Sequence, residues 1–355
     1  MKKLLYIGRP NLGENLFATP CLELLSKEYE ITLLTPERTL PVFTQYSFLK
    51  RALPGCNHKD PNAKLSLLTK AALSNILKDG DWQYAYHHDR DVLFLQNHPE
   101  ILQLKRYPVL SDKEIDISSN VHESKRFLSR TKKLMLKLQL LSLEESINYD
   151  CTVRCPRELQ LNSTTNDTIV VYQGSEECLR KLPISTINNF TKFLPNAIYL
   201  VTQETAKILQ FAEKNIKHFF IHPFQQNSLK CIMDLFETRP KVMIGPDSGL
   251  TQLASSYKIP LIWLQSRIVL ENVIDEQYKK FCTVYLKSNL TCKQDCMGCI
   301  ITRGFKNGLK ISHGGLFEAE QHLEDHKNLE CFINKTPVCL QYTEEEIKEI
   351  ISLIK

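Results

Sequence analysis

Residues 241–264, Lys-Val-Met-Ile-Gly-Pro-Asp-Ser-Gly-Leu-Thr-Gln-Leu-Ala-Ser-Ser-Tyr-Lys-Ile-Pro-Leu-Ile-Trp-Leu, decide the fold of this chain. The apolar run 242–244 predicts a buried strand that ends at a Gly-Pro break, and Asp247 or Ser248 can cap the helix that follows. Residues 260–264 predict a second buried strand. Strand, turn, helix and strand form a βαβ unit, in which parallel pairing brings the helix N-terminus to the carboxyl edge of the sheet.

That helix N-terminus is a candidate anion site. The N–H groups of Ser248, Gly249 and Leu250 and the positive end of the helix dipole favour a phosphate, and Gly249 lets the phosphate approach closely. An ordinary capped helix without a ligand explains the same pattern.

The length and composition of the chain limit its class. A chain of 355 residues exceeds the usual size of a single core, so we expect two domains. With 43% hydrophobic and 24% charged residues it is typical of a soluble globular protein, and no apolar run is long enough to span a membrane. Arg9 interrupts the apolar start too early for a signal peptide, so we expect a cytoplasmic protein. A net charge of +5 does not demand a nucleic acid partner.

The first half of the chain opens with a strand pattern at residues 3–8, a helix pattern at 17–27 and a strand pattern at 31–34. Gly13 and Glu14 are expected in the loop between the first strand and the helix, at a carboxyl edge. Further elements are expected at 82–86, a strand, and at 121–142, a helix.

Within that helix, residues 125–137 alternate cationic and apolar side chains at helical spacing. A helix beside an anionic substrate or a membrane surface has this pattern, and so does a helix with an ordinary solvated face. Both interpretations stay open at this point.

The second half follows a polar stretch, residues 143–166, that is typical of a linker. We expect strands at 169–172, 197–201, 219–222, 242–244 and 260–264, helices at 183–193, 205–213 and 228–236, and a last helix at 343–355. Strands that alternate with helices predict a doubly wound α/β sheet with right-handed crossovers.

Four motifs follow one another along the chain. They are Ile7-Gly-Arg-Pro-Asn-Leu-Gly-Glu-Asn-Leu-Phe-Ala-Thr-Pro, then Tyr172-Gln-Gly-Ser with Leu179-Arg-Lys-Leu-Pro, then Asp247-Ser-Gly-Leu-Thr-Gln-Leu-Ala, and last Pro337-Val-Cys-Leu-Gln-Tyr-Thr-Glu-Glu-Glu-Ile. Together, and in this order, they resemble glycosyltransferase family 9, the family of the lipopolysaccharide heptosyltransferases. The resemblance covers nearly the whole chain.

The resemblance implies a GT-B architecture, in which two Rossmann-like, doubly wound α/β domains face a central cleft. Residues 1–160 would bind the acceptor, and residues 161–340 would bind the nucleotide sugar and carry a cysteine-rich insertion at 290–340. Residues 341–355 would form a C-terminal helix.

The resemblance also implies roles for single residues. Glu14, where the family has Asp, would take the proton of the acceptor hydroxyl in an inverting displacement. Arg180, where the family has Lys, would neutralise the diphosphate leaving group. The donor-binding residues would be Gly13, Ser175, Lys181, Glu204, Asp247, Ser248, Gly249, Leu250 and Thr251, with Glu204 on the ribose or adenosine. Gln252 stands where a His is common, and the chemistry requires no catalytic metal or organic cofactor.

Five of the 12 cysteines are concentrated near the C-terminus. Four of them, Cys292, Cys296, Cys299 and Cys339, can supply a tetrahedral site for a structural Zn²⁺ or iron ion, with Cys331 as a substitute ligand. Reduced thiols are the alternative, and disulfides fit a cytosolic chain least.

We therefore expect a cytoplasmic glycosyltransferase that moves a heptose or a related sugar from ADP-heptose or a related nucleotide sugar to a lipopolysaccharide-core or protein hydroxyl. If the acceptor is lipopolysaccharide core, the enzyme is expected at the inner face of the cytoplasmic membrane. The alternative is a catalytically impaired, metal-stapled protein of the same fold that binds sugar nucleotides or serves in assembly. A sugar-nucleotide epimerase of the same two-domain architecture is a third hypothesis.

Overall fold

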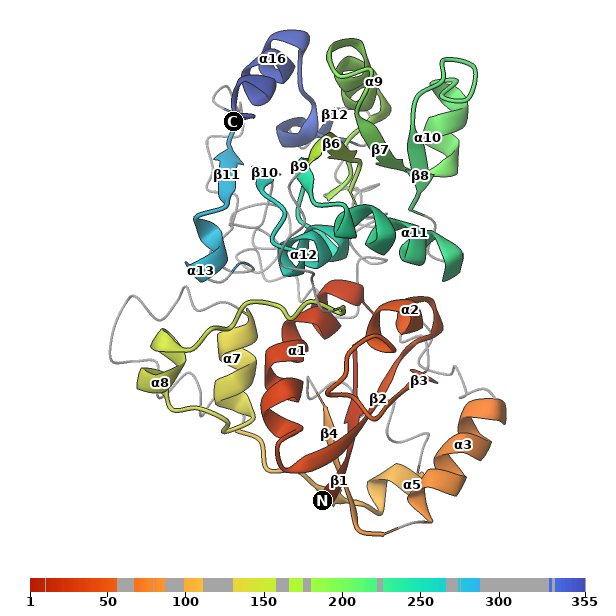
Figure 1. Cartoon of the computed structure of the whole chain (residues 1–355), viewed down its shortest axis with the longest axis vertical. Helices are drawn as coiled ribbons and strands as arrows, with labels where there is room; N and C mark the ends of the chain where they lie inside the picture. Colours follow the sequence, from red (N-terminus) through yellow and green to blue (C-terminus); the bar gives the residue numbers. More distant parts are fainter. Residues whose placement is uncertain are drawn as a thin grey trace.

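The computed structural model describes residues 1–9, 11–55, 67–78, 80–86, 99–110, 130–157, 166–174, 180–221, 226–265, 274, 276–287, 332–333 and 336–354. These residues form two α/β units stacked along the long axis of the molecule (Figure 1). No helix among them is long and apolar enough to cross a membrane.

The N-terminal unit is built on a sheet of five parallel strands in the order β3-β2-β1-β4-β5. The strands are β1 (Lys2–Ile7), β2 (Tyr29–Pro36), β3 (Arg51–Gly55), β4 (Trp82–Tyr86) and β5 (Lys105–Arg106). Its helical segments are α1 (Leu12–Leu25), η1 (Glu37–Thr39), α2 (Leu40–Phe43), α3 (Leu67–Leu77), α5 (Pro99–Leu102), α7 (Arg130–Lys137) and α8 (Leu143–Asn148). The strand order reverses between β1 and β4, so the loop that leaves β1 lies at a topological switch point.

The C-terminal unit holds six parallel strands in the order β11-β10-β9-β6-β7-β8. They are β6 (Asn166–Tyr172), β7 (Ile198–Val201), β8 (His218–Phe220), β9 (Pro240–Gly245), β10 (Leu261–Leu264) and β11 (Cys282–Tyr285). The helices are α9 (Ile184–Phe193), α10 (Gln203–Ile208), α11 (Gln226–Glu237), α12 (Gly249–Ser256), α13 (Glu276–Lys279) and α16 (Glu344–Ser352), and the short elements β12 (Phe332–Ile333), β13 (Thr336–Pro337) and η6 (Val338–Leu340) precede α16. Here the order reverses between β6 and β9.

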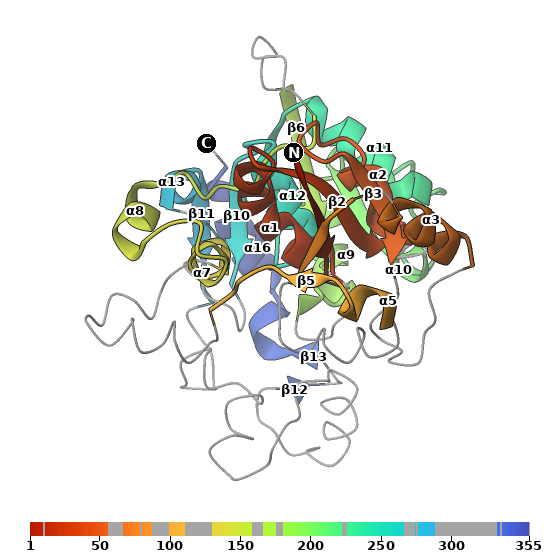
Figure 2. The same cartoon turned by 90° about the horizontal axis from the view of Figure 1, so that it is seen from below.

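The two sheets confirm the predicted α/β fold with two doubly wound units. Their central strands are buried on both faces, as parallel strands covered by helices must be, and Leu4, Leu5 and Tyr6 of β1 are fully enclosed. One hydrophobic cluster continues from Leu4 in the first unit to Trp263 in the second. Contacts of α1 with α12 and of α2 with α11 join the units, as both views show (Figure 1, Figure 2).

Helix α1 begins at Leu12, five residues earlier than the apolar pattern predicts. Gly13 and Glu14 therefore lie in its first turn, and their expected placement in a loop is wrong. Pro20 stands inside the helix, where it leaves the carbonyl of Leu16 without its usual N–H donor. The Thr19 hydroxyl donates to that carbonyl at 2.7 Å, so the helix continues through the proline.

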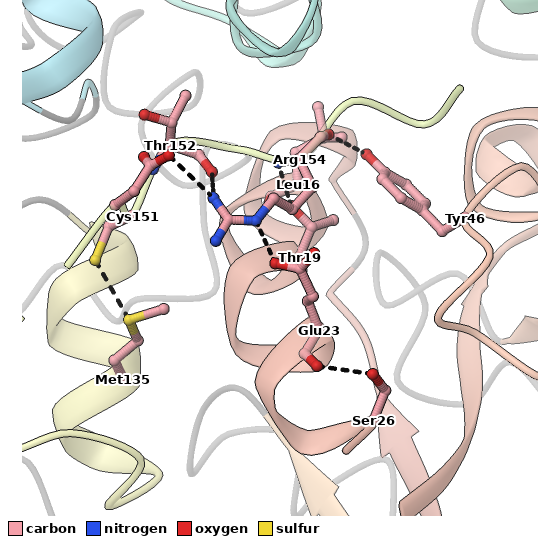
Figure 3. A network of polar contacts seen from close by, with 10 residues as sticks. Leu16, Thr19, Glu23, Ser26, Tyr46, Met135, Cys151, Thr152 and Arg154 are labelled. Carbon is pink, nitrogen blue, oxygen red and sulfur yellow. Dashed lines mark hydrogen bonds and ion pairs between the residues drawn. The ribbon is translucent and has the colours of Figure 1, made fainter. Parts of the chain in front are cut away.

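Residues 143–157 are not the free linker that their polarity suggests. Ser142 and Glu145 form a capping box that starts α8, and the hydrogen bond from the Ser142 backbone lowers the pKa of the Glu145 carboxyl. Arg154 pairs with Glu23 of α1, and its own backbone N–H donates to Thr19 (Figure 3). The connection is thus packed along the first unit.

Arg157, three residues on, is tied to the second unit instead. Its guanidinium donates to Asp234 at 2.9 Å and to Glu237, both on α11. Residues 154–157 are therefore tied to the first unit by Arg154 and to the second unit by Arg157.

The cationic helix pattern at 125–137 is described from Arg130 onward, as α7 packed on α1. Lys132 and Lys137 are buried, at 7% and 4% exposure, while Lys133 is exposed. The described part of this helix therefore presents no cationic stripe to an anionic surface.

Burial makes several thiols poor nucleophiles. It raises the pKa of Cys155 to about 11 and that of Cys21 well above its ordinary value. Because the thiolate is the reactive form, about one Cys155 side chain in 10³ is charged at pH 8, and this fraction grows as the pH rises toward 11. We expect iodoacetamide at pH 8 to modify the exposed Cys231 and to spare Cys21 and Cys155. Peptide mapping checks this, and equal modification of Cys155 and Cys231 would contradict it.

Candidate functional site

The two switch points meet where the N-terminus of α1 contacts the N-terminus of α12 (Figure 1). A Cβ added to Gly249 would lie 2.9 Å from the backbone nitrogen of Gly13 and 3.0 Å from Cβ of Leu12. A Cβ added to Gly13 would lie 3.2 Å from Cα of Gly249. The absence of a side chain at Gly249, and to a smaller extent at Gly13, allows the two helices to approach so closely.

Replacing Gly249 by Ala is expected to force this junction apart. The new Cβ would meet backbone rather than a flexible side chain, so we expect a loss of about 1–3 kcal/mol in the free energy of unfolding, as for other overpacked sites. Denaturant unfolding measures the loss. Gly55→Ala is the control, because there a Cβ meets nothing closer than 3.4 Å. Equal stability of the two variants would show that the junction is not close-packed.

Ser248 caps α12, as one of the two predicted capping residues. Its backbone N–H donates to the Thr251 hydroxyl at 2.8 Å, and its own hydroxyl accepts from the N–H of Leu250 at 3.1 Å. Two of the three N–H groups that were expected to be free are therefore engaged within the cap. The Ser248 hydroxyl also donates to the hydroxyl of Tyr172, at 2.8 Å. Sequence reasoning missed Tyr172, which reads as one more apolar position of its strand.

Asp247 forms an ion pair with Arg180, in which Nη1 of the guanidinium lies 3.4 Å from Oδ2 of the carboxylate. Asp247 is 5% exposed and Arg180 is 20% exposed, so the pair is largely withdrawn from water. Arg180 follows β6 and Asp247 follows β9, the two strands that flank the switch point of the second sheet. The structure thus joins two residues that the sequence places 67 positions apart.

The loop that carries Arg180 is closed at its base by Gly174, which has φ +109° and forms a bridge with Lys181. The backbone N–H of Leu182 donates to the carbonyl of Gln173 at 2.6 Å. Lys181 thus lies at the base of the loop that carries Arg180. Ser175, a predicted donor-binding residue, lies outside the described residues.

Gln173 is a buried residue that joins this loop to the next one. Its amide nitrogen donates to the Thr205 hydroxyl at 2.8 Å and its amide oxygen accepts from the N–H of Thr202 at 3.0 Å. Thr202 caps α10, whose first turn carries the exposed Glu204. Gln173 thereby sets the position of the turn that holds Glu204.

On the opposite side of the junction, Glu14 lies in the first turn of α1, where the helix dipole favours a carboxylate. The guanidinium of Arg9 donates to both of its oxygens, from Nε at 3.2 Å and from Nη2 at 3.4 Å. The side-chain amide of Asn11 donates to Oε2 at 3.3 Å. Arg9 and Asn11 were not predicted as site residues, because an arginine and an asparagine in a turn carry no distinctive signal.

A water-sized hollow opens between the units beside this junction. It is lined by Thr131, Cys151, Thr152 and Val153 from the first unit and by Gln252, Ser255, Ile274 and Tyr278 from the second. Gln252 is 1% exposed, and neither polar atom of its amide has a hydrogen-bond partner among the described residues. The hollow is too small for a nucleotide sugar.

The predicted metal site stays a prediction. Cys292, Cys296, Cys299 and Cys331 lie outside the described residues, and Cys339 is half-buried in η6. Among the described residues, no three His, Cys, Asp or Glu side chains are grouped closely enough to hold a metal ion.

Comparison with known proteins identifies the fold of this chain through its structure and not through its sequence. No family model and no curated protein matches this sequence. The Escherichia coli ADP-heptose lipopolysaccharide heptosyltransferase II superposes with a TM-score of 0.56 at 12% identity, over 87% of this chain and 98% of its own. A glycosyltransferase family 9 protein from Veillonella parvula DSM 2008 gives a TM-score of 0.56 at 12% identity, over 99% of this chain and 97% of its own. The E. coli heptosyltransferase WaaC, solved with ADP, gives a TM-score of 0.53 at 11% identity, over 86% of this chain and 99% of its own.

These matches extend over nearly the full length of each solved structure. At 11–12% identity they show that the chain shares the fold of the heptosyltransferases. The GT-B architecture that the four motifs imply is thereby confirmed.

Proposed function

From this shared fold, we propose that the chain is an inverting glycosyltransferase that moves a heptose from ADP-heptose to a lipopolysaccharide-core or protein hydroxyl. The observation that carries the proposal is the junction of the two helix N-termini. The N-terminus of α1 brings a carboxylate, Glu14, and Asp247, just before α12, holds a cation, Arg180, that comes from the loop after β6. A base and a leaving-group cation on opposite sides of a domain junction are what a sugar displacement requires.

In the proposed reaction Glu14 removes the proton of the acceptor hydroxyl. The acceptor oxygen forms a bond to the anomeric carbon while the bond from that carbon to the phosphate oxygen breaks, and its electron pair leaves with ADP. Arg180, Lys181 and the N-terminus of α12 stabilise the departing diphosphate. Glu204 binds the ribose or adenosine. No step requires a catalytic metal or an organic cofactor.

Donor binding requires the junction to open. In the structure the first turn of α1 covers Gly249, and the cap of α12 engages the N–H groups of Ser248 and Leu250. We propose that the two units separate at this contact to admit the diphosphate and then close on it. Closure would exclude water from the reacting atoms, which strengthens the electrostatic interactions there.

Thermal unfolding in the presence of nucleotides tests the proposed donor. ADP, UDP, GDP, CDP and ADP-heptose are compared, each at saturation. A ligand at about 100 times its dissociation constant adds about 2.7 kcal/mol, which raises the midpoint by several degrees. We expect a shift with ADP and ADP-heptose alone. Arg180→Gln is expected to lose that shift, and Lys192→Gln, a cation of an exposed ion pair on α9, to keep it. A shift with another nucleotide would reassign the donor.

The second candidate is a catalytically impaired protein that binds sugar nucleotides or serves in assembly, stapled by a structural Zn or Fe ion at Cys292, Cys296, Cys299 and Cys339. The observation that favours it is the close contact at Gly13 and Gly249, which covers the α12 N-terminus in this conformation. Metal analysis of the purified chain and of Cys292→Ser tests the ion. Nucleotide binding without release of ADP in the presence of any acceptor would favour this candidate over the enzyme.

We further propose that the reaction takes place in the cytoplasm. If the acceptor is lipopolysaccharide core, the reaction takes place at the inner face of the cytoplasmic membrane. The partners are then a nucleotide sugar and an acceptor, with peripheral contact to the membrane surface and no nucleic acid. Sedimentation with vesicles of anionic lipid tests the membrane contact. A chain that stays in the supernatant would contradict this contact.

A further inference from the structure

Arg9 is paired with Glu14, although the motif that contains both residues assigns no role to Arg9. The guanidinium of Arg9 engages both carboxylate oxygens of Glu14, through Nε at 3.2 Å and Nη2 at 3.4 Å. This forked pairing sets the direction of the carboxylate as well as its position, which a single point charge cannot do. Both side chains are largely withdrawn from water, at 19% and 24% exposure.

The backbone that carries this guanidinium is itself held from the interior. The buried Asn15 accepts a hydrogen bond from the N–H of Arg9 at 2.6 Å and donates to its carbonyl at 2.8 Å. The Asn15 amide also donates to the hydroxyl of Thr35, at the end of β2, at 3.0 Å. Gly8 leaves room for the Asn15 side chain, since a Cβ at Gly8 would lie 2.7 Å from the Asn15 side-chain oxygen. The backbone of Arg9 is therefore fixed to the sheet through Asn15.

A glutamate needs such a support more than an aspartate does. It has one more rotatable bond, and a long charged side chain gives up more rotamer freedom when it is held in one place. A base that is misplaced by about 1 Å can lose about 100-fold in rate. An additional restraint on the longer side chain therefore bears directly on the rate.

We propose that Arg9 is a positioning residue, which holds the carboxylate of Glu14 in the orientation that accepts the proton of the acceptor hydroxyl. The inference rests on the proposed function. Arg9 acts through Glu14 and not on the donor, so its removal affects the chemical step and leaves donor affinity unchanged.

Steady-state kinetics of Arg9→Gln, Arg9→Lys, Glu14→Gln and the double variant Arg9→Gln/Glu14→Gln test this. We expect Arg9→Gln to lower kcat about 10- to 100-fold and to change the KM for the donor by less than about twofold. Arg9→Lys should recover part of the loss, because it restores the charge without the fork. In the double variant Arg9→Gln should add nothing to Glu14→Gln, since residues that act through one group are not additive.

The outcomes separate the inference from the function on which it rests. Absence of transfer by the unchanged chain with every donor would overturn both. Transfer by the unchanged chain, with a raised KM but an unchanged kcat in Arg9→Gln, would overturn the positioning role alone. So would additive losses in the double variant. Lys192→Gln, which breaks an exposed ion pair with Glu344, controls for the loss of a cation. The thermal midpoint of each variant excludes unfolding as the cause of its loss.

Discussion

Glu14→Gln is expected to lose transfer by about 10²- to 10⁴-fold while it keeps the affinity of the chain for ADP-heptose. The amide preserves the shape of the side chain but cannot accept the proton of the acceptor hydroxyl, and general base catalysis contributes about that much to a rate. Donor affinity is spared because the groups proposed to bind the diphosphate lie on the other side of the junction, at Arg180 and the N-terminus of α12. Turnover with ADP-heptose and the dissociation constant by calorimetry measure the two effects.

The matched control for this change is Glu28→Gln, an exposed carboxylate just beyond the end of the same helix. It should leave both turnover and affinity unaltered. Equal loss of donor affinity and turnover in Glu14→Gln would argue that Glu14 binds the donor and is not the base. Glu14→Asp adds a second comparison. A rise in turnover above the unchanged chain would show that the longer side chain impairs the enzyme.

Local sequence signals were sufficient for the centre of the second unit, but they missed the edge strand β11, and the helix expected at 205–213 is found at Gln203–Ile208. The run from β9 through α12 to β10 was predicted within one or two residues, since the apolar strands, the Gly-Pro break and the capping Ser248 all lie within residues 241–264. Helix α16 begins one residue after its predicted start, where Thr343 caps a first turn rich in glutamate, and it ends three residues before its predicted end. Where propensity, capping and hydrophobic period agree, sequence alone specifies the element.

The start of α1 was misjudged because its local signals conflict. Gly13 and Asn15 are weak helix formers, and the apolar pattern becomes regular only from Leu16. In the structure Asn15 turns its side chain inward and binds the backbone of Arg9, and Gly13 meets Gly249 of the other unit. Contacts from distant parts of the chain therefore decide where this helix begins.

The dependence on contacts between distant parts of the chain also explains which site residues were predicted from the sequence and which were not. Glu14, Arg180 and Asp247 have roles that the family resemblance implies, whereas Arg9, Tyr172 and Gln173 lie in the same motifs without such a role and act through contacts made only in the folded chain. Tyr172 looks like an apolar strand position until its hydroxyl is seen beside Ser248. Pairings between residues far apart in sequence, such as Arg180 with Asp247, require the strand order, which one sequence does not disclose.

Gly174→Ala is expected to lower both stability and donor affinity. Gly174 has φ +109°, a conformation that residues with a side chain rarely adopt, and such strain costs about 1–3 kcal/mol. In addition, a Cβ would lie 1.9 Å from the carbonyl oxygen of Arg180, which is backbone and cannot turn away. The loop must therefore move, and it carries Arg180 away from Asp247. Denaturant unfolding and calorimetry with ADP measure the two losses.

Gly80→Ala separates the strain from the displacement of Arg180. Gly80 has a similar φ of +93°, but a Cβ there would come no closer than 3.5 Å to the flexible side chain of Lys3. It should lose about the same 1–3 kcal/mol from backbone strain and keep its affinity for ADP. If Gly174→Ala instead binds ADP as tightly as Gly80→Ala does, the position of Arg180 does not govern donor binding, and the cation on the leaving group must come from another part of the chain.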